Sequence, residues 1–321
     1  MDNEKESILA LRKIMGGYRK SRVLFTANNF RVFDHLSSPK SAKTLAHELS
    51  LDLRGTTILL DALVALELLG KVSSKYFNTD LSTKFLVSDS PDYQGDIVSH
   101  SDSLWKRWSN LDEVVRTGKP AQSTQDHKTF IMAMDNIAKM KVGDVIEAIG
   151  LEGVKSVIDV GGGPGTYSMQ MAGKGVDVTL FDRPETISIA KEFIDKAGVC
   201  GIGFMAGDFN ADDIGSGYDL ALLSQVVHSN SDKENTALVK KVKKALNENG
   251  RIVIHEFYID ENMATPAEGA LFSVNMLVNT QEGRCYPVEE IKEWLAKAGL
   301  HDIDHKLIND TVIVTAVKRD K

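Results

Sequence analysis

The feature that most constrains the fold is an apolar run that leads directly into a glycine cluster. The stretch VIDVGGGPGT, residues 157–166, has four glycines within five positions. Glycine tolerates positive φ and lets a backbone approach a ligand closely. In open α/β sheets, ligands bind beyond the carboxyl ends of the strands, where such a turn lies. The stretch therefore predicts a ligand-binding turn, with a purely structural turn as the alternative.

The second half of the chain alternates between apolar runs and amphipathic segments such as residues 233–247. Apolar strands connected by helices are typical of a parallel sheet that is covered on both faces. One more helix and a closing strand follow near the C-terminus. We therefore predict a doubly wound, Rossmann-like α/β domain over residues 151–321. Its strands correspond to VKSVIDV, DVTLFD, GIGFMAGD, YDLALLSQ and GRIVIHEF.

The first part of the chain has apolar residues at helical spacing, beginning with residues 8–36. A short helix at 42–49, a tight turn, a longer helix at about 54–69 ended by Gly70, and a hairpin at 71–80 form a winged-helix pattern. We expect a mostly helical winged-helix domain over residues 1–95. Residues 96–150 then form a helical linker that contributes to a substrate pocket.

Composition narrows the class of protein. The 321 residues have a formal net charge of −7, which opposes binding to nucleic-acid phosphates. Two cysteines, Cys200 and Cys285, lack the spacing of metal ligands, so we expect no metal site and no disulfide framework. No apolar run reaches the roughly 18 residues of a membrane span, and the N-terminus lacks a signal core. These features predict a cytoplasmic protein without a membrane partner.

A winged helix also raises the alternative of a DNA-binding regulator. Its second helix is apolar on most faces and carries Asp61 and Glu67, which phosphates would repel. An apolar helix of this kind fits a partner subunit better. We predict a homodimer in which the N-terminal domain of one chain helps to close the other chain's pocket, and we keep the binding-only regulator as an alternative.

The predicted strands deliver polar groups to one edge of the sheet. Asp159, Asp182 and Asp208 stand at the first three strand ends, and Ser224 and Glu256 at the next two. Carboxylates suit a cationic sulfonium ligand better than a pyrophosphate. Asp182 is also a candidate for accepting two ribose hydroxyls, or for capping the following helix. Asp208 and the following Phe209 either contact an adenine ring or form a turn with a core aromatic.

The motifs VIDVGGGPG, FDRPETI, GDF, LLSQVVH and GRIVIHEF are similar to those of the S-adenosylmethionine-dependent O-methyltransferases of the plant caffeate and bacterial hydroxyneurosporene type. The resemblance extends over nearly the whole chain. It implies a winged-helix dimerisation domain, a class I methyltransferase domain and S-adenosyl-L-methionine as cofactor. It also implies a set of cofactor contacts, with Ser224 beside the methionine end: Gly161, Gly163, Asp182, Asp208 and Phe209, near Asp159.

Methyl transfer to a hydroxyl benefits from a base that removes the acceptor's proton. His228 follows the fourth strand end directly, and the resemblance assigns it the role of catalytic base with Glu256 as its orienter. His255 precedes Glu256, and adjacent strand residues face opposite ways, so only one of them faces the pocket. These residues predict an O-methyltransferase that acts on a small, aromatic molecule.

Two departures from the family pattern affect the expected specificity. Ser229 and Asn230 stand where Asp-Trp usually follows the histidine, and Arg284 or Cys285 replaces a second acidic helper. A C-methyltransferase of a pigment or polyketide therefore stays an alternative. Candidates for contact with the substrate, which equally fit a core role, are Phe130, Met134, Phe272, Asn275 and Met276.

Overall fold

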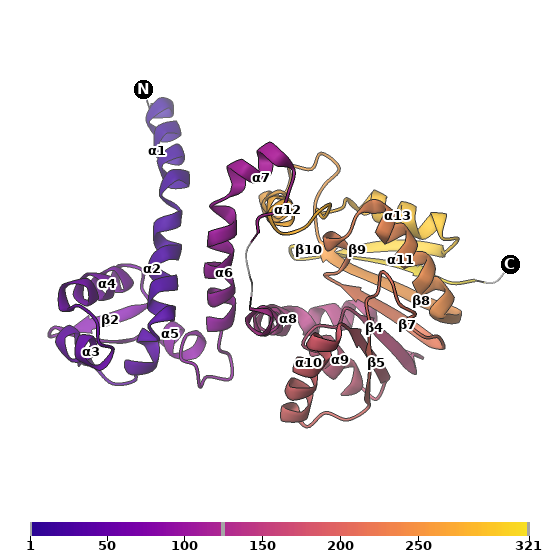
Figure 1. Ribbon diagram of the computed structural model, residues 1–321, viewed down its shortest axis with the longest axis horizontal. Helices are drawn as coiled ribbons and strands as arrows, with labels where there is room; N and C mark the ends of the chain where they lie inside the picture. The colour runs from indigo at the N-terminus through magenta and orange to yellow at the C-terminus, as the bar shows by residue number, and fades with distance from the viewer. Residues whose placement is uncertain (1, 123–125, 320–321) are drawn as a thin grey trace. The chain divides into compact units, whose positions relative to one another are not determined.

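The computed structural model of the chain describes residues 2–122 and 126–319 (Figure 1). It contains two compact units, Met1–Trp105 and Lys106–Lys321, which are treated separately below. In the described parts of the chain, no helix combines the length and the apolar character that crossing a membrane requires.

The N-terminal unit has the helices and the hairpin of a winged helix. Helix α3 (Ala42–Glu48) and helix α4 (Leu53–Ala65) precede the hairpin of β2 (Leu69–Val72) and β3 (Lys75–Asn78). Strand β1 (Lys40–Ser41) completes a sheet of order β1-β3-β2. Ser41 caps α3 through the Thr44 amide, and Asp52 caps α4 through the Gly55 amide. The other elements of the unit are α1 (Asp2–Gly16), α2 (Tyr18–Asn29), η1 (Val32–His35), α5 (Asp80–Phe85) and most of α6 (Gly95–Trp108).

The expected end of the second helix at Gly70 is wrong. Helix α4 ends at Ala65, and the chain reverses at Glu67, which has a φ of 61°. Gly70 lies inside β2 instead, where an added Cβ would come within 2.2 Å of the Phe77 ring. Gly70 therefore permits close strand-to-ring packing and does not end a helix.

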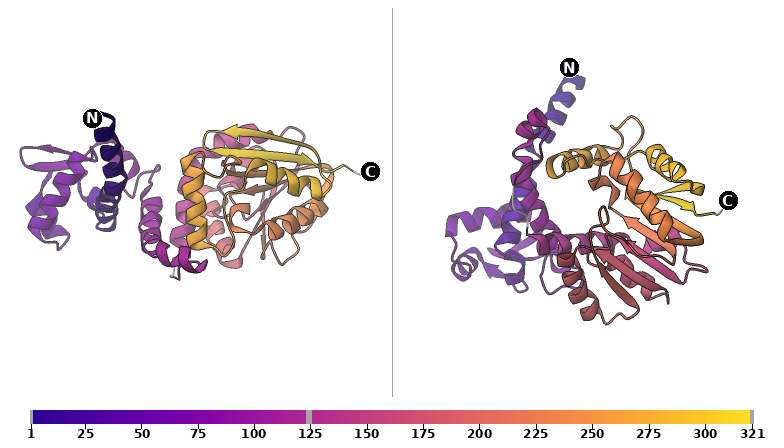
Figure 2. Two further views of the ribbon diagram at one scale, coloured as in Figure 1. Left: turned by 90° about the horizontal axis from the view of Figure 1, so that it is seen from above. Right: turned by 45° about the vertical axis from the view of Figure 1, so that its right-hand side comes forward.

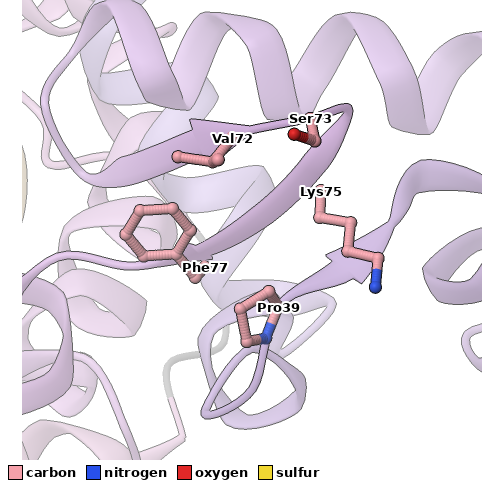
Figure 3. A pocket seen from close by; sticks show the side chains of 5 residues that line it. All are labelled: Pro39, Val72, Ser73, Lys75 and Phe77. Atoms are coloured by element: carbon pink, nitrogen blue, oxygen red, sulfur yellow. The ribbon is translucent and has the colours of Figure 1, made fainter.

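The hairpin of this unit borders a hollow of about 470 Å³. Figure 3 shows its lining side chains on the hairpin and on the segment before β1. The lining holds Lys75 and Ser73 beside apolar groups, but no carboxylate or imidazole. We assign it no part in the chemistry discussed below.

The C-terminal unit contains a seven-stranded sheet of order β6-β5-β4-β7-β8-β10-β9 (Figures 1 and 2). Neighbouring strands from β6 to β8 are parallel, and β10 pairs antiparallel with both β8 and β9. Strands β5 and β6, which follow β4 in the chain, lie on one side of it, and β7 then pairs with its other side. The strand bounds are β4 (Ser156–Val160), β5 (Asp177–Asp182), β6 (Ile202–Ala206), β7 (Tyr218–Ser224), β8 (Leu246–Phe257), β9 (His301–Ile308) and β10 (Thr311–Val317).

Helices cover both faces of this sheet, as the doubly wound prediction requires. On one face, α8 (His127–Ile149) and α9 (Thr166–Ala172) bury Val157, Leu222 and Val253. On the other face, α11 (Asp232–Ala245) and α13 (Val288–Lys297) bury alternate residues of the same strands, including Ile158 and Ile254. The remaining helices are α7 (Leu111–Thr117), α10 (Pro184–Ala197), η2 (Val227–Ser229) and α12 (Ala267–Asn279).

Two details of the C-terminal unit differ from the prediction. The amphipathic helix ends at Ala245, and Leu246 already begins β8. Strand β9 was not expected, because its sequence HDIDHKLI has no apolar run and most of its residues are exposed. Polar residues are common on an edge strand, where they discourage pairing with another chain.

Candidate active site

The glycine turn lies at the point where the strand order reverses. The amides of Gly161 and Gly162 donate to the Phe181 carbonyl at 2.8 and 3.3 Å, which holds the turn against β5. Gly161 has a φ of 72°, and an added Cβ would lie 2.8 Å from Val226 Cγ2. Gly163 has a φ of 56°, and an added Cβ would meet nothing within 4 Å. Gly161 thus serves close packing, whereas Gly163 borders open space.

Two carboxylates converge on this turn. Asp182 Oδ2 accepts a hydrogen bond from the Gly163 amide at 2.8 Å, and Oδ1 accepts one from the Arg183 amide at 2.7 Å. Asp159 is buried and accepts a 2.6 Å bond from the Ser168 hydroxyl. Burial raises the pKa of Asp159 to about 6, and burial also raises the pKa of Asp182. The N-cap of α10 is Arg183, so Asp182 is not in the capping position.

The loop after β6 lies against the same turn. The Cε1 atom of Phe209 is 3.6 Å from the position of a Cβ on Gly161. Asp208 Oδ1 accepts a 2.8 Å bond from the Asn210 amide, and the Asp208 amide donates to Asp212. Lys241 Nζ donates to the Phe209 carbonyl at 2.8 Å. The loop is therefore held beside the glycines by the chain's own contacts.

His228 and Glu256 are directly hydrogen-bonded. His228 Nδ1 lies 2.7 Å from Glu256 Oε2, and the amides of Val227 and His228 donate to Oε1 at 2.8 and 3.3 Å. The carboxylate is almost fully buried, whereas 14% of the His228 side chain is exposed. Among the described residues, no hydrogen bond reaches His228 Nε2. A carboxylate on one ring nitrogen places the proton there and leaves the other nitrogen as an acceptor.

His255 and Ser224 form a separate pair on the opposite face of β8. His255 Nδ1 lies 2.9 Å from Ser224 Oγ, and the ring meets Tyr167 edge-on at 6.1 Å. His255 is buried, and its Nε2 atom has no hydrogen-bond partner in the described part of the chain. Burial lowers the pKa of His255 to about 4. Ser224 therefore reaches the glycine-turn end of β7 already bonded to a neutral imidazole.

The five candidates for substrate contact have different surroundings. The Phe272 ring meets the His228 ring edge-on, with centroids 4.9 Å apart. Asn275 Oδ1 accepts a hydrogen bond from Trp108 Nε1 at 3.0 Å, and Met276 is buried. Phe130 and Met134 lie half-buried on α8. Of the five, Phe272 contacts His228.

Sequence reasoning missed Phe257, whose ring centroid lies 3.9 Å from that of Phe272 and 6.2 Å from that of His228. Its position next to Glu256 at the end of β8 was a usable signal.

No three His, Cys, Asp or Glu side chains gather as metal ligands would in the described ranges.

Comparison with known proteins identifies the chain. Residues 110–301 match the family model of an O-methyltransferase domain, and residues 12–88 match that of an O-methyltransferase dimerisation domain. The chain is 30% identical over 309 residues to 3-hydroxy-5-methyl-1-naphthoate 3-O-methyltransferase of Streptomyces sahachiroi, covering 91% of this chain and 89% of that protein. It is 30% identical over 314 residues to acetylserotonin O-methyltransferase of Gallus gallus, covering 89% of this chain and 90% of that protein.

Solved structures agree with these matches. Human N-acetylserotonin methyltransferase, in complex with S-adenosylmethionine, superimposes with a TM-score of 0.89 at 26% identity over 98% of each chain. An O-methyltransferase family protein from Burkholderia thailandensis gives a TM-score of 0.88 at 27% identity, again over 98% of each chain.

The sheet order and the glycine turn at its switch point thus define a class I methyltransferase fold. The chain belongs to the S-adenosylmethionine-dependent O-methyltransferase family and has both its catalytic and its dimerisation domain. It uses S-adenosylmethionine to methylate a small molecule on oxygen, which confirms the predicted fold, cofactor and enzyme class.

Proposed function

We propose that the enzyme methylates a hydroxyl of a flat aromatic molecule, with His228 as general base and Glu256 as its orienter. The relatives' names give 3-hydroxy-5-methyl-1-naphthoate and acetylserotonin as their acceptors, which supports an aromatic acceptor here. The observation that carries the proposal is the 2.7 Å bond between His228 Nδ1 and Glu256 Oε2.

The chain's own residues fit the cofactor. Gly163 borders open space, and the carboxylates of Asp159 and Asp182 lie at the same turn, where a cation is favoured. S-adenosylmethionine supplies a methyl group on a positively charged sulfur. Asp182 would accept hydrogen bonds from the ribose hydroxyls, and Asp208 would accept one from the adenine amino group. Phe209 would cover the face of the adenine ring. Gly161 and Gly163 would line the turn, and Ser224 would lie beside the methionine end.

The role of His228 as a base depends on which of its ring nitrogens carries the proton. A phenol has a pKa near 10 and is mostly protonated at neutral pH, so removal of its proton as the bond forms contributes about 10²–10⁴-fold to the rate. Glu256 keeps the His228 proton on Nδ1, because a carboxylate only accepts. Nε2 then takes the acceptor's proton, and Glu256 stabilises the imidazolium that forms. The acceptor oxygen must be held within about 3–3.5 Å of the methyl carbon.

The aromatic pair beside His228 supports a flat acceptor. Phe257 and Phe272 have ring centroids 3.9 Å apart, and both rings lie next to the imidazole. Aromatic side chains favour offset or edge contacts with another ring, so they would orient a flat acceptor with its hydroxyl toward Nε2. Phe130 and Met134 on α8 stay proposed as further substrate contacts, as do Asn275 and Met276.

Replacement of His228 by Ala tests the base. We expect kcat to fall by about 10²-fold or more while affinity for S-adenosylhomocysteine, measured by calorimetry, stays unchanged. The control is His305→Ala, which removes an exposed imidazole on β9. A kcat for His228→Ala within threefold of the wild type would contradict the role of His228 as general base.

We also propose that the N-terminal domain, residues 1–95, holds two chains together as a homodimer, with residues 96–150 as the helical link to the catalytic domain. The dimerisation-domain match and the exposed apolar residues of α1 support this. Ile14 is 80% exposed and Met15 is 66% exposed, with Ile8 and Leu11 one or two turns earlier. Such a surface is unusual for a monomer. Light scattering that gives a monomer's mass at micromolar concentration would contradict this proposal.

A further inference from the structure

Three asparagines form a hydrogen-bonded chain between the loop after β6 and the His228 turn. Asn235, fully buried on α11, donates from Nδ2 to the Val227 carbonyl at 2.9 Å. Its Oδ1 accepts from Asn230 Nδ2 at 3.1 Å. Asn230 Oδ1 in turn accepts from Asn210 Nδ2 at 3.1 Å. One continuous line of amides therefore joins residues 210, 230 and 235.

The direction of this line is set by its last acceptor. A backbone carbonyl cannot donate, so Asn235 must present its NH₂ group to Val227 and its oxygen to Asn230. The same requirement then turns the Asn230 oxygen toward Asn210. Each amide has one arrangement that satisfies its neighbours, and a buried network that is fully satisfied is rigid.

Both ends of the line reach groups of the proposed site. At one end, the backbone N–H of Asn210 donates to Asp208 Oδ1 at 2.8 Å. At the other end, Val227, whose carbonyl receives Asn235, donates its own amide to Glu256 Oε1 at 2.8 Å. Glu256 is the residue that holds His228. The proposed adenine contact and the proposed base are thus connected by hydrogen bonds within the protein, together with the covalent structure of Asn210 and Val227.

The turn that carries His228 has little freedom to move independently. The Tyr286 hydroxyl donates to the Asn230 carbonyl at 2.6 Å. An added Cβ on Gly283 would lie 2.4 Å from the His228 carbonyl oxygen, which shows how tightly the loop after α12 packs against the turn. A shift of Asn230 would therefore move the His228 backbone with it.

We infer that Asn230, with Asn210 and Asn235, is a positioning residue that couples occupation of the cofactor site at Asp208 to the placement of the His228–Glu256 pair. This inference rests on the proposed function. It gives a role to a departure from the family pattern, since Asn230 stands two residues after the proposed base. Coupling between two sites is reciprocal, so a change at the His228 end must also change affinity at the cofactor end.

The test uses S-adenosylhomocysteine as the probe and calorimetry of the full-length protein. Asn235→Ala removes the bonds to Val227 and Asn230 and changes no residue of the loop at Asp208. We expect it to weaken binding of the probe by about threefold to tenfold. In the background of Asn210→Ala, which disconnects the loop, the same Asn235→Ala change should have no further effect. The matched control is Asn28→Ala, which removes a buried amide that bonds Gly95 and Ser99 in the N-terminal unit.

The possible outcomes separate the inference from the proposed function. Additive effects of Asn210→Ala and Asn235→Ala, or an unchanged affinity in Asn235→Ala, would overturn the coupling even if His228→Ala abolishes transfer. Conversely, a His228→Ala enzyme that keeps its turnover would contradict the base but leave the binding cycle interpretable. If Asn235→Ala does not fold, Asn230→Ser breaks the same line and enters the same cycle with Asn210→Ala, and the same outcomes decide.

Discussion

Two histidines near the end of β8 have contrasting environments, although His255 is the sequence neighbour of Glu256, the partner of His228. His228 bonds the buried carboxylate of Glu256, and its second nitrogen has no partner in the described ranges. His255, the residue before Glu256, points to the opposite face, its ring is hydrogen-bonded to the Ser224 hydroxyl, and burial lowers its pKa to about 4. The ring is the same, but the partner and the solvent access differ. A buried carboxylate beside a partly exposed imidazole fits the role of base that we propose for His228, whereas burial next to a hydroxyl makes His255 a neutral core residue.

The largest expected effect comes from removing the charge of Glu256, the partner that distinguishes His228 from His255. In Glu256→Gln, the side-chain oxygen can still accept from the Val227 amide, which leaves the NH₂ group facing His228 Nδ1. Nδ1 must then accept, and the proton moves to Nε2, where it blocks proton removal. We expect kcat to fall by about 10²–10⁴-fold in initial-rate measurements.

A control for this change is Glu261→Gln, which alters an exposed carboxylate shortly after the end of β8. It should leave kcat within twofold of the wild type. An equal loss in both variants would point to a general effect of charge and would remove the distinction between the two histidines.

The second prediction concerns acid stability, where His255 and Asp159 act in opposite directions. The pKa of His255 falls from 6.5 to about 4 on folding, so below pH 6.5 the unfolded chain takes up a proton that the native state refuses, and stability falls. The pKa of Asp159 rises from 3.8 to about 6, so below pH 6 the native state takes up the proton first, and stability rises. In the wild type the two contributions largely cancel.

Single variants should separate these contributions. Between pH 7 and 4.5, His255→Gln should gain about 2 to 3 kcal/mol of unfolding free energy relative to the wild type, and Asp159→Asn should lose about 2 kcal/mol. Urea denaturation at several pH values measures both. If the unfolding free energies of the two variants changed with pH in parallel, burial would not be holding His255 neutral. The contrast with His228 would then lose its electrostatic basis.

The sequence predicted this contrast only in part. Alternation along β8 was enough to place His255 and Glu256 on opposite faces, because side chains of a strand alternate whatever surrounds them. The acidic strand ends were equally predictable, since parallel strands end at one edge. The local pattern did not show that Ser224 would bond His255, because that contact joins two strands in a register that depends on the whole sheet.

The same limit explains the other differences. Strand β9 has the composition of a loop and becomes a strand through pairing with β10. Asn210, Asn230 and Asn235 look like ordinary turn and helix residues in the sequence, and their connection arises where a loop, a turn and a helix pack together. Local patterns therefore predicted the elements and the strand ends, whereas the partners of buried polar groups required the tertiary structure.

The smallest effect is expected at Ser224, and it tests the contrast from the His255 side. If this hydroxyl only helps to hold the methionine end of the cofactor, Ser224→Ala loses one hydrogen bond, about 0.5–1.5 kcal/mol. Calorimetry should then show S-adenosylhomocysteine binding weakened by about twofold to tenfold, with kcat within threefold and partial recovery in Ser224→Thr. A hundredfold loss of kcat in Ser224→Ala, with normal binding, would instead mean that the proton leaves through Ser224 and His255. His228 would then be the positioning group, and the functions assigned to the two imidazoles would be reversed.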